Sequence, residues 1–384
     1  MHRRRFALLA AAYLALGTGA HAAQPGADEA MQRIADAAIQ PMMADNDVPG
    51  VAVGITVSGK QFVFSYGVAD KATGRKVTAS TVFEIGSLSK TFTATLGADA
   101  LVEGKLSLAD PASNYLPALR GSALDRVTLL ELATFTAGGL PLQFPDAVTN
   151  DSQMLAYFTG WKGDFSPGAQ RLYSNPSIGL FGYLAAKSLG ASFNDLMQHE
   201  IVGGLGLRHT FLKVPPAEMG NYAFGYTKDN RPIRVAPGVF DAEAYGIKST
   251  VGDMLRFVDA NMGAVPVDPT LGRAIAATHV AYYQVGPLLQ GMGWEQVRYP
   301  TTLDSLLAAN SSDMAYQPHP ATALASGTAP TDVLLNKTGS TNGFGAYAAF
   351  LPGQKLGVVI LANKNVPIPA RVKAAYAILS ALPH

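Results

Sequence analysis

The sequence predicts an α+β protein of the α/β sandwich type, with an antiparallel sheet flanked by helices and an inserted, mostly helical lobe. Two pairs of β-rich runs lie near opposite ends of the chain, and a short turn joins each pair. A helical pattern stands outside each pair, at residues 31–42 and 372–382. Sheets and amphipathic helices bury their apolar faces against one another. We therefore expect the two ends of the chain to close one domain.

The first 22 residues have the features of a secretory signal peptide. Three arginines at positions 3–5 precede the apolar run Phe6–Leu16, and the segment ends in Ala20-His21-Ala22. A small-x-small end is typical of a cleavage site, and the apolar run is shorter than the about 20 residues that cross a bilayer. We expect cleavage after Ala22, which leaves residues 23–384 as one folded unit without a membrane anchor.

The composition excludes several kinds of chemistry. The chain has no cysteine, which excludes disulfides, thiolate metal sites and a cysteine nucleophile. The histidines beyond the signal segment are scattered and never fall at metal-ligand spacing, so we expect no metal and no other cofactor. Removing the three signal-segment arginines from the 29 Lys and Arg leaves 26 against 28 Asp and Glu, a net charge of −2. That balance predicts no nucleic-acid partner, and we expect a monomer.

The segment after the signal peptide predicts a helix followed by a β-hairpin. Apolar residues recur at helical spacing from Met31 to Met42, and the helix should end before Pro49. Two β-rich runs, 51–57 and 61–67, are joined by Ser-Gly-Lys and predict the hairpin.

The middle of the chain changes character. Residues 96–108, 128–135 and 152–159 look helical and are broken by prolines and a pair of glycines. This pattern predicts a helical lobe at residues 105–172, inserted between two parts of a sheet lobe. We expect a cleft where the two lobes meet.

The predicted sheet lobe comprises residues 23–104 and 173–384. Residues 210–330 are rich in Gly, Pro and Tyr and predict only mixed strands, short helices and long loops. Near the end of the chain, runs 346–351 and 356–361 are joined by Pro-Gly-Gln and predict a second hairpin. Apolar residues at helical spacing between 372 and 382 then predict a final helix.

The first candidate site is the stretch Phe83–Phe92, in which an apolar run ends at Gly86 and opens into a helix. In such a helix Ser87 and Lys90 share a face, since residues three apart lie about 60° apart around the axis. The amine could then take the serine proton, provided that its surroundings keep it neutral against an ordinary pKa of about 10.4. The alternative is a Ser-x-x-Lys coincidence without function.

Two later segments offer partners for this serine. Tyr173 and Asn175 stand two apart, so in an extended segment both side chains project the same way. A tyrosine near two lysines could have its phenolate favoured and act as a general base. Lys337 and Gly339 would share one side of a strand, where glycine leaves room for a ligand against the backbone. The alternatives are a buried tyrosine before an Asn-Pro turn, and an edge strand with an exposed lysine.

Taken in this order, Ser-x-x-Lys, Tyr-x-Asn and Lys-Thr-Gly resemble the motifs of the penicillin-recognising serine hydrolases. Within that superfamily the sequence is similar to the class C β-lactamases, the AmpC-type cephalosporinases. The likeness covers essentially the whole chain after the signal peptide. The matching segments are Phe83–Phe92, Leu132–Gln143, Tyr173–Asn175, Tyr245–Ser249, Lys337–Gly345 and Leu361–Val372.

The resemblance implies a periplasmic serine β-lactamase that hydrolyses cephalosporins and penicillins and contributes to antibiotic resistance, with its active site in the cleft between the lobes. Ser87 would be the acylated nucleophile, Lys90 and Tyr173 would handle the protons, and Lys337 would complete the catalytic group. Whether Tyr173 or Lys90 is the principal base stays open.

The resemblance also implies how a β-lactam substrate would be held. Backbone N–H groups of Ser87 and Ser340 would form the oxyanion hole, and Gln143 and Asn175 would bind the substrate's side-chain amide. The other implied substrate-binding residues wall the site or lie near the substrate carboxylate: Tyr245, Thr338, Gly339, Asn365 and Arg371.

Two positions depart from the family pattern. Asn336 stands where some members have histidine, and Ile368 stands where several have a polar residue that touches the substrate carboxylate. Either change could alter the response to inhibitors. The alternative functions are a D-alanyl-D-alanine carboxypeptidase or an esterase of the same fold and, less favoured, a non-catalytic penicillin-binding sensor.

Overall fold

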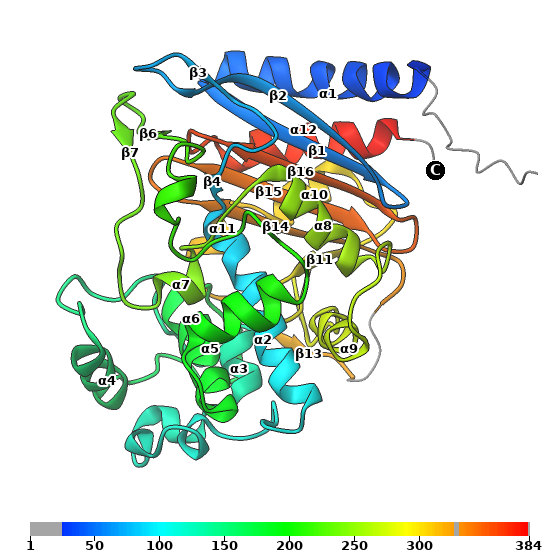
Figure 1. The fold of residues 1–384 in the computed structure, drawn as a ribbon. Helices are drawn as coiled ribbons and strands as arrows, with labels where there is room; N and C mark the ends of the chain where they lie inside the picture. The colour runs from blue at the N-terminus through cyan, green and yellow to red at the C-terminus, as the bar shows by residue number, and fades with distance from the viewer. Residues whose placement is uncertain (1–24, 326–329, 383–384) are drawn as a thin grey trace, which may run out of the picture.

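The computed structural model describes residues 25–325 and 330–382, so the predicted signal peptide and its cleavage site lie outside the described residues. A large sheet separates two layers of helices (Figure 1). The first and last helices, α1 (Pro25–Asp45) and α12 (Ile368–Ala381), lie side by side on one face of this sheet. The remaining helices gather mostly on the other face and below it. The predicted sandwich, closed by the two ends of the chain, is thereby confirmed.

Ten strands of the described chain form this sheet, with antiparallel pairing throughout. The two predicted hairpins are present and lie next to each other, because Val51 pairs with Ala362. In spatial order the strands are β13 (Thr322–Ala323), β9 (Tyr283–Val285), β10 (Leu288–Gln290), β11 (Glu295–Arg298), β14 (Val333–Ser340), β15 (Gly345–Leu351), β16 (Leu356–Ala362), β1 (Gly50–Val57), β2 (Lys60–Asp70) and β3 (Arg75–Lys76).

The central strands are apolar on both faces because both faces are covered. Every residue of β15 and β16 is buried, which is the pattern expected of strands enclosed between two helical layers. Along β1, Val51 and Val53 join the core under α1 and α12, whereas Ala52 joins the core on the opposite face. Gly54 lets helix α8 (Val251–Asn261) approach the sheet closely, since a Cβ there would lie 2.6 Å from Leu255.

Helix α2 (Ser89–Val102) runs through the middle of the molecule. Its residues from Ser89 to Ala100 are all buried, with Phe92 in the core of the sheet and Ala94 in the core of the helical lobe. The helix predicted at residues 96–108 ends earlier than expected, because the chain turns at Gly104, which has φ +69°. A left-handed glycine is a common end of a helix.

A third hydrophobic core lies among the helices of the lower half in Figure 1. It takes side chains from residues 105–172 and also from α2 and α5, so the predicted lobe boundaries stay a prediction. The predicted helices at 128–135 and 152–159 are present as α3 (Leu129–Ala133) and α4 (Asp151–Gly160).

The remaining α-helices of the described chain are α5 (Asn175–Leu189), α6 (Phe193–Leu196), α7 (Asp241–Ala244), α9 (Pro269–Thr278), α10 (Leu303–Ala309) and α11 (Ser312–Tyr316).

Within residues 25–325 and 330–382, three small strand pairs connect loops outside the large sheet. One of them, β4 with β8, positions the chain just before Ser87. The pairs are β4 (Phe83–Glu84) with β8 (Lys248–Ser249), β5 (Gln170–Arg171) with β12 (His319–Pro320), and β6 (Gly225–Tyr226) with β7 (Pro232–Ile233).

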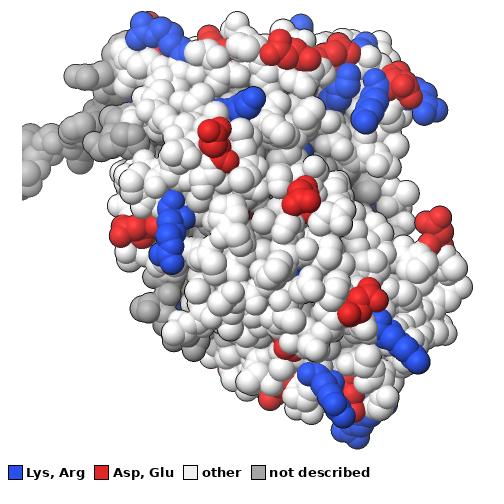
Figure 2. Space-filling model, turned by 180° about the vertical axis from the view of Figure 1, so that it is seen from behind, with Lys and Arg blue, Asp and Glu red and all other residues white. Residues whose placement is uncertain are grey.

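Surface charge and helix hydrophobicity are relevant to the predictions of no nucleic-acid partner and no membrane anchor. On the face seen in Figure 2, Lys and Arg lie interspersed with Asp and Glu, and neither sign forms a continuous patch there. Among helices of the described ranges, none has both the length and the apolar character needed to cross a membrane.

Candidate active site

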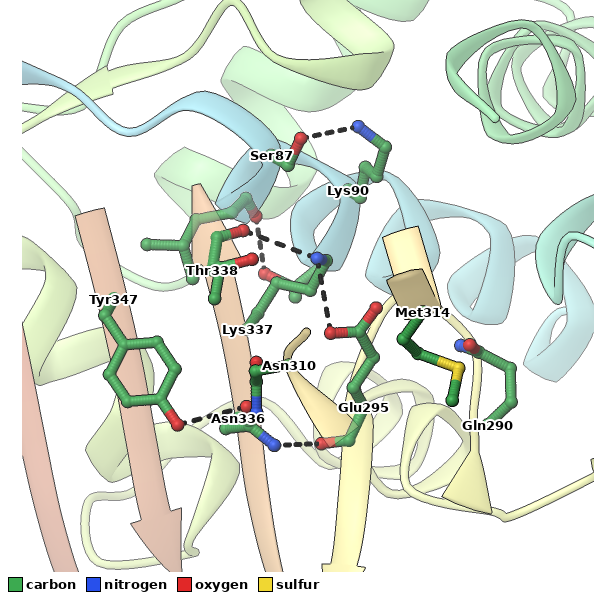
Figure 3. A network of polar contacts seen from close by, with 12 residues as sticks. Ser87, Lys90, Gln290, Glu295, Asn310, Met314, Asn336, Lys337, Thr338 and Tyr347 are labelled. Atoms are coloured by element: carbon green, nitrogen blue, oxygen red, sulfur yellow. Dashed lines mark hydrogen bonds and ion pairs between the residues drawn. The ribbon is translucent and has the colours of Figure 1, made fainter. Parts of the chain in front are cut away.

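Ser87 lies in a tight turn between β4 and α2. The turn is a single 3₁₀ turn, Gly86–Leu88, and the α-helix proper begins at Ser89, two residues later than the predicted start. The predicted contact nevertheless forms, because Lys90 Nζ lies 2.9 Å from Ser87 Oγ (Figure 3). Ser89 is fully buried, and its hydroxyl donates to Gly86 O at 2.8 Å. Only Ser87 of these two serines is therefore open to a substrate.

The Lys90 amine is held where a proton acceptor is needed. The side chain is fully buried, and Nζ lies 2.7 Å from the backbone oxygen of Ala244. Burial, aided by the positive charge of Lys337 and opposed by Tyr173, lowers the pKa of Lys90 to about 8. A neutral amine has two N–H donors and one lone pair, so it can donate to Ala244 O and still accept the proton of Ser87.

Tyr173 lies between the two lysines. The ring centroid is 5.0 Å from Lys90 Nζ and 4.8 Å from Lys337 Nζ. Burial alone would raise the pKa of Tyr173, but the charges of Lys337 and Lys90 outweigh it and hold that pKa below its ordinary value. The expectation of one extended segment is wrong at Asn175, which is the first residue of α5 after the cap residue Ser174. Tyr173 and Asn175 still face the same cavity.

Lys337 is anchored by a buried ion pair that the sequence did not predict. Its Nζ lies 3.5 Å from Glu295 Oε2, and Glu295 Oε1 also accepts from Arg171 Nη2 at 2.9 Å. Arg171 is 1% exposed and donates further to Gln290 Oε1 and to Met314 O. The three charged groups therefore form a network that lines the cavity together with Tyr173, and the Lys337–Glu295 pair of this network is seen in Figure 3.

Two glycines allow β14 to dock against the Ser87 turn. A Cβ on Gly339 would lie 1.9 Å from Ile85 O, and one on Gly86 would lie 2.3 Å from the backbone nitrogen of Ser340. The space beside Gly339 was expected to receive a ligand. That expectation is wrong, because the Ile85 carbonyl fills it. The close approach brings the backbone of Ser340 next to the turn that carries Ser87.

A cavity of about 560 Å³ opens at Ser87. Two buried polar atoms on its wall, Tyr173 Oη and Asn175 Oδ1, form no hydrogen bond of ordinary geometry within the described chain. Such atoms are expected to meet water or a ligand. The predicted residues that line the cavity are Ser87, Gln143, Tyr173, Asn175, Tyr245, Lys337, Thr338, Ser340 and Asn365, together with Ile368.

Three predicted site residues lie behind the cavity wall: Lys90, Gly339 and Arg371. Arg371 is 1% exposed. Its guanidinium donates to Gly339 O, to Ala346 O at 2.8 Å and to Ser340 Oγ at 2.9 Å. Arg371 therefore links helix α12 to strands β14 and β15 through hydrogen bonds.

Asn336 also lies away from the cavity. Its Nδ2 donates to the backbone oxygen of Glu295 at 3.0 Å, and its Oδ1 accepts from Tyr347 Oη at 3.1 Å (Figure 3). Because side chains alternate along a strand, Asn336 points opposite to Lys337. Its effect on a ligand is therefore indirect, through the position of β11 and β15.

Glu84 is a second buried acid that sequence reasoning missed. It is 1% exposed, and its Oε1 accepts from Tyr222 Oη at 2.6 Å and from Val235 N at 2.7 Å. Its Oε2 accepts from Thr341 Oγ1 at 2.6 Å. The carboxylate ties the strand before Ser87 to two loops of the cavity wall. An acidic residue two positions before a glycine carries no signal that could have indicated this role.

The described residues contain no group of three or more His, Cys, Asp or Glu side chains placed to hold a metal ion. The groups that can carry chemistry at the cavity are the Ser87 hydroxyl, the amines of Lys90 and Lys337, and the Tyr173 phenol.

Known proteins share the sequence and the fold of this chain. The family model described as Beta-lactamase matches residues 35–382. A protein named Beta-lactamase from Pseudomonas fluorescens is 53% identical over 353 residues, which cover 92% of this chain and 99% of the relative. A solved class C beta-lactamase in complex with cefoxitin has a TM-score of 0.90 at 45% identity, covering 93% of this chain and all of that one. A solved D-alanine carboxypeptidase AmpC from Burkholderia cenocepacia has a TM-score of 0.89 at 46% identity, with 93% and 100% coverage.

Proposed function

Because this chain belongs to the β-lactamase family and is a class C β-lactamase, we propose that it is a secreted enzyme that opens the β-lactam ring of cephalosporins and penicillins through an acyl-enzyme on Ser87. The observation that carries the proposal is the contact between Ser87 Oγ and a buried lysine whose pKa is lowered to about 8. Antibiotic resistance and a periplasmic location follow from the same proposal.

Acylation would begin with attack of Ser87 Oγ on the carbonyl carbon of the lactam. Lys90, in its neutral form, would accept the hydroxyl proton as the new C–O bond forms. The negative charge on the carbonyl oxygen would be met by the backbone N–H groups of Ser87 and Ser340, each typically worth about 3 to 4 kcal/mol in the transition state. As the C–N bond breaks, the lactam nitrogen would take its proton from the Tyr173 side.

Release of the acyl group requires water activated by a base. The charges of Lys337 and Lys90 outweigh burial and lower the pKa of Tyr173. This lowered pKa supports a base on the Tyr173 side of the acyl group. We propose that water approaches from the Tyr173 side, adds to the acyl carbon and transfers a proton toward Tyr173. The ester bond to Ser87 Oγ then breaks, and the serine recovers its proton.

Substrate would be held by the polar side chains of the cavity wall. Lys337 and Thr338 are proposed to bind the carboxylate beside the lactam ring, with Asn365 nearby. Gln143 and Asn175 are proposed to bind the side-chain amide, and the free Oδ1 of Asn175 supports this role. Tyr245 would pack against the substrate side chain from the opposite wall.

A D-alanyl-D-alanine carboxypeptidase is the second candidate, because a solved protein of closely similar structure is named a D-alanine carboxypeptidase. Acylation is common to both activities, and they differ in how quickly a β-lactam acyl group is released. Steady-state kinetics on an early cephalosporin, an oxyimino cephalosporin and a D-Ala-D-Ala peptide separates them. We expect rapid multiple turnover of the first, slow release of the second and little cleavage of the peptide.

The matched control for these assays is Ser87→Ala, which should abolish turnover of every substrate. A cephalosporin acyl-enzyme that persists for hours, together with brisk release of D-alanine from the peptide, would show that the protein is a carboxypeptidase. Secretion is tested separately, by N-terminal sequencing of protein recovered from the periplasm. A mature chain beginning at residue 23 is expected.

A further inference from the structure

A second cavity, of about 600 Å³, is lined in part by the chain segment that directly precedes Tyr245. It is bounded by the start of α4, the end of α5 and residues 237–243. Its lining shares no residue with that of the cavity at Ser87. Its volume falls within the range of about 300–1,000 Å³ that is usual for small-molecule sites.

An acid without a partner lies in this cavity. Glu243 on α7 lines it and is 8% exposed. Across the described residues, no other side chain donates to its carboxyl group or pairs with it, and its own backbone N–H is the one donor to that group. Burial raises the pKa of Glu243 to about 8. A carboxyl group in this position is neutral in most molecules at pH 7 and lacks the cation that would ionise it.

The walls around Glu243 are aromatic and predominantly acidic. Phe240 and Phe193 are buried and line the cavity with the partly exposed Tyr183. The charged groups that face it are Asp241 on the same helix, Asp151 on α4 and the exposed Lys187 on α5. Acids outnumber bases, which disfavours an anionic ligand. Aromatic rings also attract cations through their faces.

We propose that this cavity is a second ligand site, which binds an organic ammonium ion with an aromatic or alkyl body. The ammonium group pairs with Glu243 at the buried end, and the apolar body packs on Phe240 and Tyr183. A primary ammonium supplies both the charge and the hydrogen-bond donors that the carboxylate lacks. Because binding draws Glu243 into its ionised form, affinity rises with pH toward 8 and above.

Glu243 directly precedes Ala244, whose backbone oxygen contacts the Lys90 amine. The backbone oxygen of Glu243 accepts from Thr93 Oγ1 at 2.7 Å, and that of the next residue, Ala244, lies 2.7 Å from Lys90 Nζ. A ligand held by Glu243 therefore acts on the helix that positions the proton acceptor. Because the two cavities are separate, such a ligand and a β-lactam bind together.

The test uses 2-phenylethylammonium as the probe and isothermal titration calorimetry as the readout, with 2-phenylethanol as the uncharged probe of the same shape. We expect the alcohol to bind at least tenfold more weakly. Glu243→Gln should weaken binding of the ammonium at least tenfold. Binding to the unaltered protein should tighten several-fold from pH 7 to pH 8.5, where the probe stays charged.

A pair of surface variants keeps the test valid if Glu243→Gln does not fold. Lys187→Glu, at the rim of the cavity, should tighten binding, whereas Lys373→Glu, an exposed site on α12, makes the same charge change elsewhere and should leave it unaltered. Equal binding of the alcohol, equal effects of the two lysine variants, or no detectable binding overturns the proposal. Purely competitive inhibition of cephalosporin hydrolysis also overturns it, because it would place the probe in the Ser87 cavity.

Discussion

The function of Lys90 depends on whether its buried amine is neutral. With a pKa lowered to about 8 by burial and by Lys337, the amine is mostly protonated at pH 6 and mostly neutral at pH 9. If it accepts the proton of Ser87, the rate of acylation should rise with pH to a midpoint near 8. Stopped-flow acylation by a chromogenic cephalosporin between pH 5 and 10 measures this profile.

The matched variants for this prediction are Lys90→Arg and Lys105→Arg. Arginine keeps the charge but cannot become neutral, so Lys90→Arg should slow acylation by about 10²–10⁴, the usual contribution of a general base. Lys105 is exposed and lies outside the three motifs, and its replacement should change nothing. Acylation by Lys90→Arg at a near-normal rate would assign proton transfer to Tyr173.

Arg371 should act on the stability of β14 more than on substrate binding. In Arg371→Ala, the buried oxygens of Gly339 and Ala346 lose a charged donor, and unsatisfied buried groups cost about 1–3 kcal/mol each. The free energy of unfolding should fall by about 2–6 kcal/mol, and kcat should fall because Ser340 is displaced. Urea unfolding and steady-state kinetics measure the two effects.

The control for Arg371 is Lys373→Ala on the same helix, where the side chain is exposed. It should leave both the unfolding free energy and kcat unchanged. If Arg371→Ala unfolds like the unaltered protein and only KM rises, then the arginine binds the substrate carboxylate, as the resemblance to class C β-lactamases implies.

At the level of single residues, short-range spacing was informative and long-range pairing was not. Ser87 and Lys90 could be joined from sequence because three residues of helix fix their separation. Glu295 could not be found in this way, because it stands in a four-residue strand, and its partners Arg171 and Lys337 are far from it in the chain. A buried acid gives no local pattern when the charges that compensate it come from other elements.

The docking of β14 onto the start of α2 is the contact between elements on which the site depends. Gly339→Ala would set a Cβ 1.9 Å from Ile85 O, and Gly86→Ala would set one 2.3 Å from Ser340 N at φ +53°. Both neighbours are backbone atoms that cannot rotate away. We expect each variant to lose at least about 100-fold in kcat, the usual effect of losing an oxyanion donor.

Gly252→Ala is the matched control for the glycine variants. Gly252 lies in α8, and apart from its chain neighbours and the backbone of its own helix no atom lies within 4 Å of the Cβ position, so alanine there should keep full activity. Because alanine favours a helix over glycine, unfolding should cost up to about 1 kcal/mol more. Far-UV circular dichroism with heating and cephalosporin assays measure both effects. Normal kcat and stability in Gly339→Ala would show that the two elements can separate without consequence.

Elements with strong periodicity were predicted, and those whose pattern depends on a distant partner were not. The two hairpins and the terminal helices carry regular apolar spacing, and all of them are present. Residues 210–330 gave weak signals because strands such as β9 and β10 have three residues each and are stabilised by their neighbours. Helix α8 could have been found there, since its apolar residues 251, 254, 255 and 258 repeat at helical spacing.

The sheet closes only when both ends of the chain are in place, and this gives a prediction for the whole molecule. Helix α1 packs on α12 and on the β1 side of the sheet, where Ala35 and Ile39 are fully buried and Met31 and Met42 nearly so. Each large apolar side chain of this kind contributes about 1.5–3 kcal/mol. Met31, Ile39 and Met42, together with the apolar sheet surface that the helix covers, contribute an amount comparable to a whole net stability of about 5–15 kcal/mol. A chain of residues 46–384 should therefore fail to fold.

The matched comparison is the chain of residues 23–384, which lacks only the predicted signal peptide and should fold and turn over cephalosporins at the full rate. Circular dichroism, analytical gel filtration and cephalosporin assays on the two truncated chains measure the difference. The Ser87 site lies far from α1 along the chain, so loss of activity in the shorter chain reports the failure of the sheet and not of the chemistry. If residues 46–384 fold and hydrolyse cephalosporins normally, the strands alone hold the site, and closure by the N-terminal helix is dispensable.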